Sequence, residues 1–327
     1  MPTQPHEDAA PPPLHWDGQP ELVHVATVET AHRRYQFIAQ AVQRLHSVTG
    51  SVPELHSATI TPLAVGGGMA VYKITAHLLD YPAALLVCKI PHQRRIVYTT
   101  PTDHQTAAQT TGQLLDRLVT LADALAHRAP GIFPRSGGVW HWQEADGTDQ
   151  HLLVEEFIPG LSVERLKNRY EQEWLENQLS ATAYHQQRIA VERLAVATFI
   201  RLWDALDRRL FTSDPSPWNV LVSQPAERWA APQVATIIDL HGLEDDVGLT
   251  YVIQRLAAVY GMRQDIVHDV LIPGVLDALG VPEGTALLHA ALPELEAEAA
   301  RMRHNLGVDV QQPLLHGLRT LLAASSA

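Results

Sequence analysis

Two short apolar runs, each joined to a polar loop, constrain the fold of this chain more than any other feature. The loop TSDPSPWN carries Asp214 and Asn219 and leads into the run VLV. The run VATIID ends at Asp239 and is followed by LHG. Short apolar runs bounded by Pro and Gly are typical of buried strands. A long helical pattern, RIAVERLAVATFIRLWDAL, precedes both runs, so we expect a helix followed by two strands with polar residues at their ends.

Each of these polar residues also has a purely structural interpretation. Asp214 followed by proline is a common turn opener, and Asn219 could cap a turn. Asp239 could end a strand in a surface loop. All three occur together, and each loop meets an apolar run after a long helix. This combination favours one functional site over three separate structural roles.

The first half of the chain shows a different order of patterns. The strand-like segments SATITPLAV, MAVYKITAHLL and AALLVCKIP come first, and a helical pattern follows over 103–127. Two more strands are expected, around GGVWHW and in QHLLVEEF. Before all of these, an amphipathic helix has Tyr35, Ile38, Val42 and Leu45 on one face.

These patterns predict three segments. Residues 1–57 would form a flexible Pro-rich arm followed by the amphipathic helix, and residues 58–158 would form a small strand-rich domain. Pro159 and Gly160 mark a break, after which residues 159–327 would form a mostly helical domain that carries the two polar loops. We expect an α+β fold.

The composition excludes several classes of protein. The net charge of -12 argues against nucleic acid or an anionic membrane as a partner. Cys88 is the single cysteine, which excludes an intramolecular disulfide and suits a reducing compartment. The 18 histidines are scattered without the spacing of a zinc site. No signal peptide or long apolar span is apparent, so we expect a cytoplasmic protein.

The polar loops resemble those of a known superfamily. The step from Asp214 to Asn219 matches the D-x-x-x-x-N catalytic loop of protein kinases, and Pro217 matches the variant D-x-x-P-x-N. Asp239 stands where the aspartate of D-F-G stands. Three strands, a helix and two strands are also the order of a kinase small lobe. The chain therefore resembles the protein-kinase-like superfamily. It looks like an atypical bacterial kinase, with features of Ser/Thr kinases and of aminoglycoside-phosphotransferase-like small-molecule kinases.

The resemblance implies a two-lobed fold with a five-stranded small lobe, a mostly helical large lobe and an extra N-terminal helix. It implies an ATP-dependent phosphotransferase that moves the γ-phosphate to a hydroxyl on a small molecule or a protein. ATP and Mg²⁺ would be the cofactors. Asp214 would accept the proton of the acceptor hydroxyl, and Asn219 and Asp239 would hold magnesium.

The nucleotide would be bound mainly by residues before the break. Lys89, in LLVCKIP, matches the strand-three lysine that pairs with the α- and β-phosphates. The glycines 66–68 (Gly66, Gly67 and Gly68) resemble the Gly-rich loop, whose N–H groups reach phosphate, although they would also suit a hairpin turn. In LLVEEFIPG, the backbone at Glu156 and Ile158 would contact adenine.

The chain departs from the family at several positions. Thr212 and Ser213 replace the His and Arg of H-R-D, and no A-P-E motif follows Asp239. The helix expected over 103–127 contains no glutamate to pair with Lys89. Asp116, Gln113 or, as the sharper hypothesis, Glu155 would take that role, because a buried carboxylate without a cation is costly.

Two other functions stay open. The departures favour a pseudokinase, which is a nucleotide-binding or scaffolding module without turnover. A helical interaction protein with accidental motifs is the third possibility. The acceptor is not specified by the sequence. The acidic run over 244–246 would suit a cationic substrate, but such a run is also typical of a solvated surface.

Overall fold

The computed structural model describes residues 14–16, 28–46, 54–65, 69–91, 101–143, 147, 149–223, 235–240, 242–306 and 311–325. The chain forms two compact units: unit 1 contains residues 1–124 and 134–157, and unit 2 contains residues 125–133 and 158–327. The main break lies between Phe157 and Ile158. The segment boundary expected from the sequence followed residue 158, and the roles assigned to the segments stay predictions.

Unit 1 is built on a sheet whose described strands run in the order β1-β2-β3-β4-β6-β5. All neighbouring strands are antiparallel except β1 and β2, which are parallel. The elements are β1 (Leu14–Trp16), α1 (Val28–His46), β2 (Leu55–Val65), β3 (Met69–Leu78), β4 (Ala84–Pro91), α2 (Pro101–Arg128), β5 (Ser136–Gln143) and β6 (Asp149–Glu156). The five antiparallel strands, with a helix between the third and the fourth, confirm the predicted α+β pattern and are consistent with a kinase-like fold.

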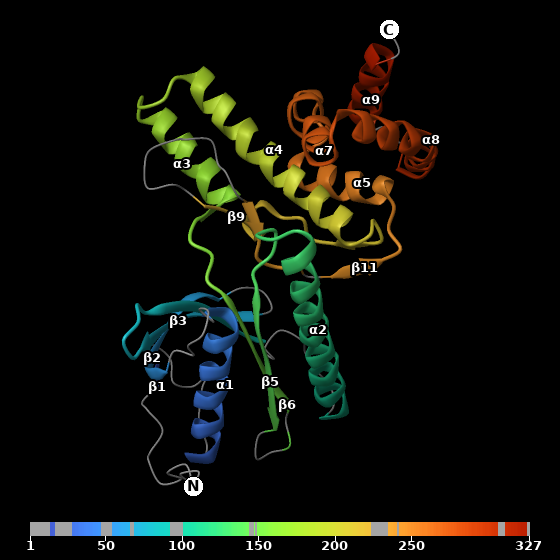
Figure 1. Cartoon of the computed structure of the whole chain (residues 1–327). Helices are drawn as coiled ribbons and strands as arrows, with labels where there is room; N and C mark the ends of the chain where they lie inside the picture. The colour runs from blue at the N-terminus through green and yellow to red at the C-terminus, as the bar shows by residue number, and fades with distance from the viewer. Residues whose placement is uncertain are drawn as a thin grey trace. The chain divides into compact units, whose positions relative to one another are not determined.

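Helix α1 packs against this sheet (Figure 1). Ile38, Val42 and Leu45, three of the four residues of the predicted stripe, are buried in a core shared with the strands, and Tyr35 packs at its margin. The strands contribute alternate residues to the same core, among them Ile60, Ile74, Leu86, Cys88 and Val154. Burial raises the pKa of the Cys88 thiol to about 12, so this cysteine acts as a core residue and not as a nucleophile.

Three residues of the segment expected to be a flexible arm form a strand. Residues 14–16 pair in parallel with β2, where Leu14 lies opposite Ala58 and Trp16 opposite Ile60. A three-residue strand after a run of prolines is too short to produce a periodic pattern, so only the sheet edge reveals it. The other residues of the expected arm lie outside the described residues.

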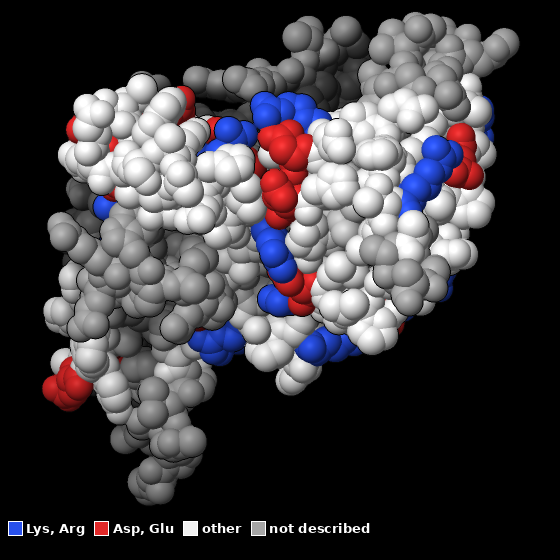
Figure 2. Space-filling view, turned by 90° about the horizontal axis from the view of Figure 1, so that it is seen from above, with Lys and Arg blue, Asp and Glu red and all other residues white. Residues whose placement is uncertain are grey.

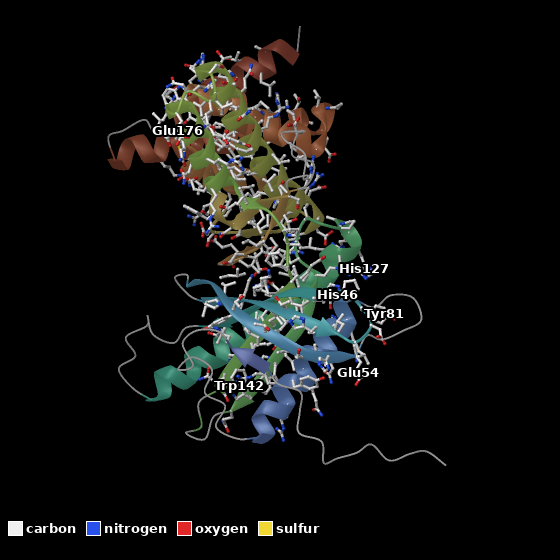
Figure 3. All side chains as sticks on the ribbon, turned by 90° about the vertical axis from the view of Figure 1, so that its left-hand side faces the viewer. His46, Glu54, Tyr81, His127, Trp142 and Glu176 are labelled. Carbon is white, nitrogen blue, oxygen red and sulfur yellow. The ribbon has the colours of Figure 1, made fainter. Side chains whose placement is uncertain are left out.

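A buried arginine joins α1 to β5. The Arg34 guanidinium carbon lies 5.6 Å from the ring centroids of both Trp140 and Trp142. The two indoles are themselves stacked, with centroids 4.4 Å apart, and Trp142 is labelled in Figure 3. Aromatic faces attract a guanidinium, and this attraction compensates part of the cost of burying its charge.

Unit 2 consists mainly of helices, with short strand pairs between them. Its elements are β7 (Leu161–Ser162), α3 (Val163–Leu175), α4 (Ala181–Ala205), β8 (Leu210–Thr212), η3 (Pro217–Asn219), β9 (Val220–Val222), β10 (Ala235–Ile237), β11 (Leu243–Asp245), α5 (Leu249–Tyr260), α6 (Gln264–Ile266), the π-helix η4 (Val267–Leu271), α7 (Ile272–Leu279), α8 (Val281–Leu306) and α9 (Gln312–Ser325). The Ser162 hydroxyl accepts the Arg165 N–H and so caps the first turn of α3. Pro293 lies inside α8.

Helix α4 is the central helix of unit 2, and α3 and α7 pack against it. Gly274 of α7 permits one close approach, because a Cβ at this position would lie 2.5 Å from Val196 Cγ1. On the α3 side, the Lys167 ammonium lies 3.0 Å from the Glu192 carboxylate, whose side chain is 1% exposed. Burial alone would lower the pKa of Lys167, but the hydrogen bonds that it donates to Glu164 and Glu192, together with their charges, outweigh burial and raise this pKa. A charged contact thus fixes α3 on α4.

The surface seen in Figure 2 carries acidic and basic side chains in alternation along a band. Unit 2 contains several ion pairs between neighbouring charges: Arg193 contacts Asp277, and Arg208 contacts both Asp204 and Glu283. Among the helices in the described ranges, none combines the length and the apolar character needed to cross a membrane.

We predict that α1 contributes substantially to the stability of unit 1. Ile38→Ala should lower the free energy of unfolding by about 2–5 kcal/mol, because it leaves a cavity under the sheet. Urea denaturation followed by tryptophan fluorescence measures this change. Gln40→Ala, at an exposed position of the same helix, is the matched control and should stay within about 0.5 kcal/mol of wild type. Equal values for the two variants would contradict the packing of α1.

Candidate functional site

The two polar loops of unit 2 lie between two antiparallel strand pairs. Strand β8 pairs with β11, with Thr212 opposite Leu243, and β9 pairs with β10, with Val220 opposite Ile237. The two polar loops, residues 213–219 and residues 238–242, therefore connect the same two ladders. We call them the catalytic loop and the metal loop after the roles expected from the sequence. This topology confirms that the two apolar runs are neighbouring strands.

Backbone hydrogen bonds join the two loops at both ends. The Ser213 N–H donates to the Gly242 carbonyl over 2.9 Å, and the Ile238 N–H donates to the Asn219 carbonyl over 2.8 Å. Asp214 and Asn219 lie between these bonds on one loop, and Asp239 lies between them on the other. The structure therefore brings together the three residues that the sequence singled out.

Asp214 is held from two sides. The Asn219 amide nitrogen lies 3.2 Å from its carboxylate, and the buried Thr212 hydroxyl accepts its backbone N–H over 3.2 Å. The Asp214 residue is nevertheless exposed. An exposed carboxylate on a fixed backbone can still meet a substrate, which is what a catalytic base requires.

The residues present at these loops fit a magnesium ion. Magnesium prefers oxygen ligands and is usually held by one or two protein groups together with phosphate and water. The amide nitrogen of Asn219 faces Asp214, so its amide oxygen points away from that contact and remains suitable as a ligand. The half-buried Asp239 supplies a carboxylate from the facing loop. Asn219 and Asp239 together form a donor set of the expected type.

The charge of Asp214 also contributes to the pKa of another side chain of unit 2, that of Tyr260. The Tyr260 hydroxyl is buried and has no hydrogen-bond partner among the described residues. Burial raises its pKa well above the usual value, and the charges of Glu192, Glu164 and Asp214 raise it further. Tyr260 therefore stays protonated.

Lys89 forms a buried ion pair in unit 1. Its ammonium nitrogen lies 2.6 Å from Glu155 Oε2, and the two side chains are 10% and 3% exposed. This confirms the hypothesis that Glu155 pairs with Lys89. Asp116, the alternative partner on α2, lies 3.0 Å from His141 Nε2. The acid that pairs with Lys89 therefore comes from strand β6 and not from helix α2.

The pairing of β4 with β6 explains why this ion pair can form. Lys89 lies opposite Leu153, and Val87 lies opposite Glu155. Residues two apart on a strand point to the same face, so Lys89 and Glu155 are diagonal neighbours within reach of long side chains. Cys88 points to the other face, into the core beneath α1.

The two residues expected to contact adenine, Glu156 and Ile158, belong to different units. Glu156 ends β6, where its N–H donates to the Arg135 carbonyl over 2.9 Å and its carboxylate lies 3.0 Å from the Arg135 guanidinium. Because the Glu156 N–H already donates to Arg135, the Glu156 backbone could contact adenine through its carbonyl oxygen, which would accept a hydrogen bond. Ile158 is the first residue of the long second segment of unit 2. Gly66, Gly67 and Gly68 lie outside the described residues.

The acidic run after the metal loop is paired with arginines. Arg209 donates to the Asp246 carboxylate over 2.8 Å, and Arg255 lies 3.5 Å from Glu244. These contacts neutralise much of the negative charge. The run therefore offers little support for a cationic acceptor.

Sequence reasoning missed two contacts in the catalytic loop. It treated Thr212 and Ser213 only as departures from H-R-D, whereas Thr212 holds the Asp214 N–H and Ser213 bonds to Gly242. A hydroxyl residue two positions before an acid was the available signal, because Ser and Thr side chains often bond to backbone N–H groups two or three residues away.

Comparisons with known proteins add little to this geometry. No protein-family model matches the chain, and no curated protein matches it. One of the matching solved structures is described as WaaP in complex with acyl carrier protein. It is 15% identical, the match covers 74% of this chain and 88% of that chain, and the TM-score is 0.39. A TM-score this low carries no argument, so the interpretation of the site rests on the contacts of the chain itself.

We predict that the pair Lys89–Glu155 behaves as a buried ion pair. Removing the Glu155 carboxylate takes a close counter-charge from the buried Lys89 ammonium, so Glu155→Gln should lower the free energy of unfolding by about 3–5 kcal/mol. The double variant Lys89→Met with Glu155→Leu should be more stable than Glu155→Gln, because it removes both charges. Urea denaturation of the single and double variants measures these differences.

The ion pair between Arg44 and Asp123 provides the control for this cycle. Its side chains are 47% and 50% exposed, so Asp123→Ala should cost no more than about 1 kcal/mol. If Glu155→Gln cost no more than Asp123→Ala, the Lys89–Glu155 contact would not be a buried ion pair in solution.

Proposed function

We propose that this protein is an ATP- and Mg²⁺-dependent phosphotransferase that transfers the γ-phosphate to a hydroxyl group on a small molecule or a protein. The observation that carries the proposal is the pair of hydrogen-bonded loops that brings Asp214, Asn219 and Asp239 together. Phosphoryl transfer needs positioning and charge neutralisation more than covalent chemistry from the protein. An acid beside a two-ligand magnesium site supplies both requirements.

Each residue has a separate role in this proposal. Asp214 takes the proton of the acceptor hydroxyl while the new oxygen–phosphorus bond forms and the bond to the leaving ADP breaks. Asn219 and Asp239 hold magnesium, which neutralises phosphate charge when bound. Lys89 binds the α- and β-phosphates, and the Glu155 carboxylate keeps its ammonium charged and oriented. Adenine would be bound by the backbone around Glu156 and Ile158.

The alternative is a pseudokinase that binds nucleotide without turnover. Two departures from the family favour it: Thr212 stands in the place of a histidine, and α2 lacks the usual glutamate. Each departure, however, coincides with a contact that does the same work. Thr212 holds the Asp214 backbone, and Glu155 pairs with Lys89. We therefore favour an active enzyme.

The proposal predicts different consequences for the two acids. Asp214→Ala should lower the rate of ADP release with Mg-ATP by about 10²–10⁴-fold, the usual contribution of a general base. The same variant should keep the thermal stabilisation that Mg-ATP gives to the wild type. Asp239→Ala should lose both turnover and most of the Mg-dependent stabilisation, because it removes a metal ligand. Coupled ADP release and thermal unfolding measure the two effects.

Asp277→Ala is the matched control, because Asp277 is an acid of the same unit that pairs with Arg193 on the surface. It should leave turnover and stabilisation unchanged. If the wild type is stabilised by Mg-ATP but never releases ADP, the pseudokinase is the correct function. If ATP at millimolar concentration neither stabilises the protein nor is consumed, both functions are wrong.

A further inference from the structure

We propose that the close packing of Ser213 against Gly242, which has no side chain, is a positioning contact that aligns the catalytic loop with the metal loop. This inference rests on the proposed function, because it explains how the base Asp214 and the magnesium ligand Asp239 are kept in register. The two residues in contact are close in sequence to the two acids. Ser213 comes directly before Asp214, and Gly242 is three residues after Asp239.

The contact has a backbone part and a side-chain part. The Ser213 N–H donates to the Gly242 carbonyl over 2.9 Å. A Cβ added to Gly242 would overlap the Ser213 hydroxyl oxygen. After that oxygen, the Ser213 Cβ is the nearest atom, at 3.2 Å from the added Cβ. The serine side chain therefore occupies the space that any other residue at 242 would need.

The backbone of Gly242 adds a second constraint. Its φ of +56° lies in the left-handed region, which glycine adopts without strain and other residues adopt at a cost. At this φ the carbonyl of Gly242 faces the Ser213 N–H. This conformation restricts the direction in which the backbone enters β11 after Gly242. At the opposite end the bond from Ile238 to Asn219 fixes the same loop.

Ser213 stands where the superfamily that the sequence resembles has an arginine or a glycine before the catalytic acid. The neighbouring Thr212 accepts the Asp214 N–H and so fixes the backbone within its own loop. The contact of Ser213 with Gly242 and the bond from Ile238 to Asn219 join the two loops directly. The contact of Ser213 includes its side chain.

A pair of substitutions separates the steric contact from the backbone strain. Gly242→Ala forces the added methyl group onto the Ser213 hydroxyl and should lower turnover at least 30-fold. It should also raise the Mg²⁺ concentration for half-maximal activity at least fivefold, because Asp239 moves relative to Asn219. Combining Gly242→Ala with Ser213→Ala removes the overlapping oxygen. The double variant should recover at least tenfold of the lost turnover and return the Mg²⁺ requirement toward that of wild type.

Gly248→Ala is the control, because an added Cβ there meets no atom within 4 Å and its φ is not positive. It should match wild type in turnover and in Mg²⁺ requirement. A purely structural role of the contact would change thermal stability while leaving the Mg²⁺ requirement unchanged at a temperature well below unfolding. That outcome, or a double variant no better than Gly242→Ala, would overturn the positioning role.

The thermal unfolding of the nucleotide-free variants separates this inference from the proposed function. Rescue of Gly242→Ala by Ser213→Ala should appear in the unfolding temperature even if the wild type shows no response to Mg-ATP. In that case the contact exists, but the phosphotransferase proposal and the positioning role fail together. Absence of rescue in the unfolding temperature, with an active wild type, would overturn the contact alone.

Discussion

The candidate site depends on the two hydrogen bonds that connect the catalytic loop to the metal loop, from Ser213 to Gly242 and from Ile238 to Asn219. A catalytic base and the side chains that hold a metal ion act together only if the distance between them is fixed to within a fraction of an ångström. Side chains on two independent loops would not meet this requirement. Two antiparallel ladders, β8 with β11 and β9 with β10, meet it because each loop is anchored at both ends.

A second constraint operates in unit 1, where a charge is buried beside the sheet. Lys89 and Glu155 lose most of their hydration, and only their mutual contact and further hydrogen bonding make this acceptable. In the superfamily that the sequence resembles, this carboxylate is expected on the helix that follows the lysine strand. Here it comes from β6, which is paired to β4 in the same sheet.

Two departures from the patterns of the superfamily that the sequence resembles coincide with contacts in the structure. Thr212 stands where a histidine is expected, and its hydroxyl accepts the Asp214 N–H. The helix expected to carry a glutamate has none, and Glu155 of β6 lies against Lys89 instead. The first contact lies within one loop and the second within one sheet.

The sequence by itself determined the order of the main helices and strands. It also singled out Asp214, Asn219, Asp239 and Lys89 as candidate site residues. Apolar periodicity and the spacing of polar residues are local properties that a chain carries without its fold. The tertiary structure decided the rest: the strand at residues 14–16, the partner of Lys89, and the contact of Ser213 with Gly242. These depend on strand register and on close approach between segments distant in sequence. No periodicity records such contacts, because they form only when the segments are packed together.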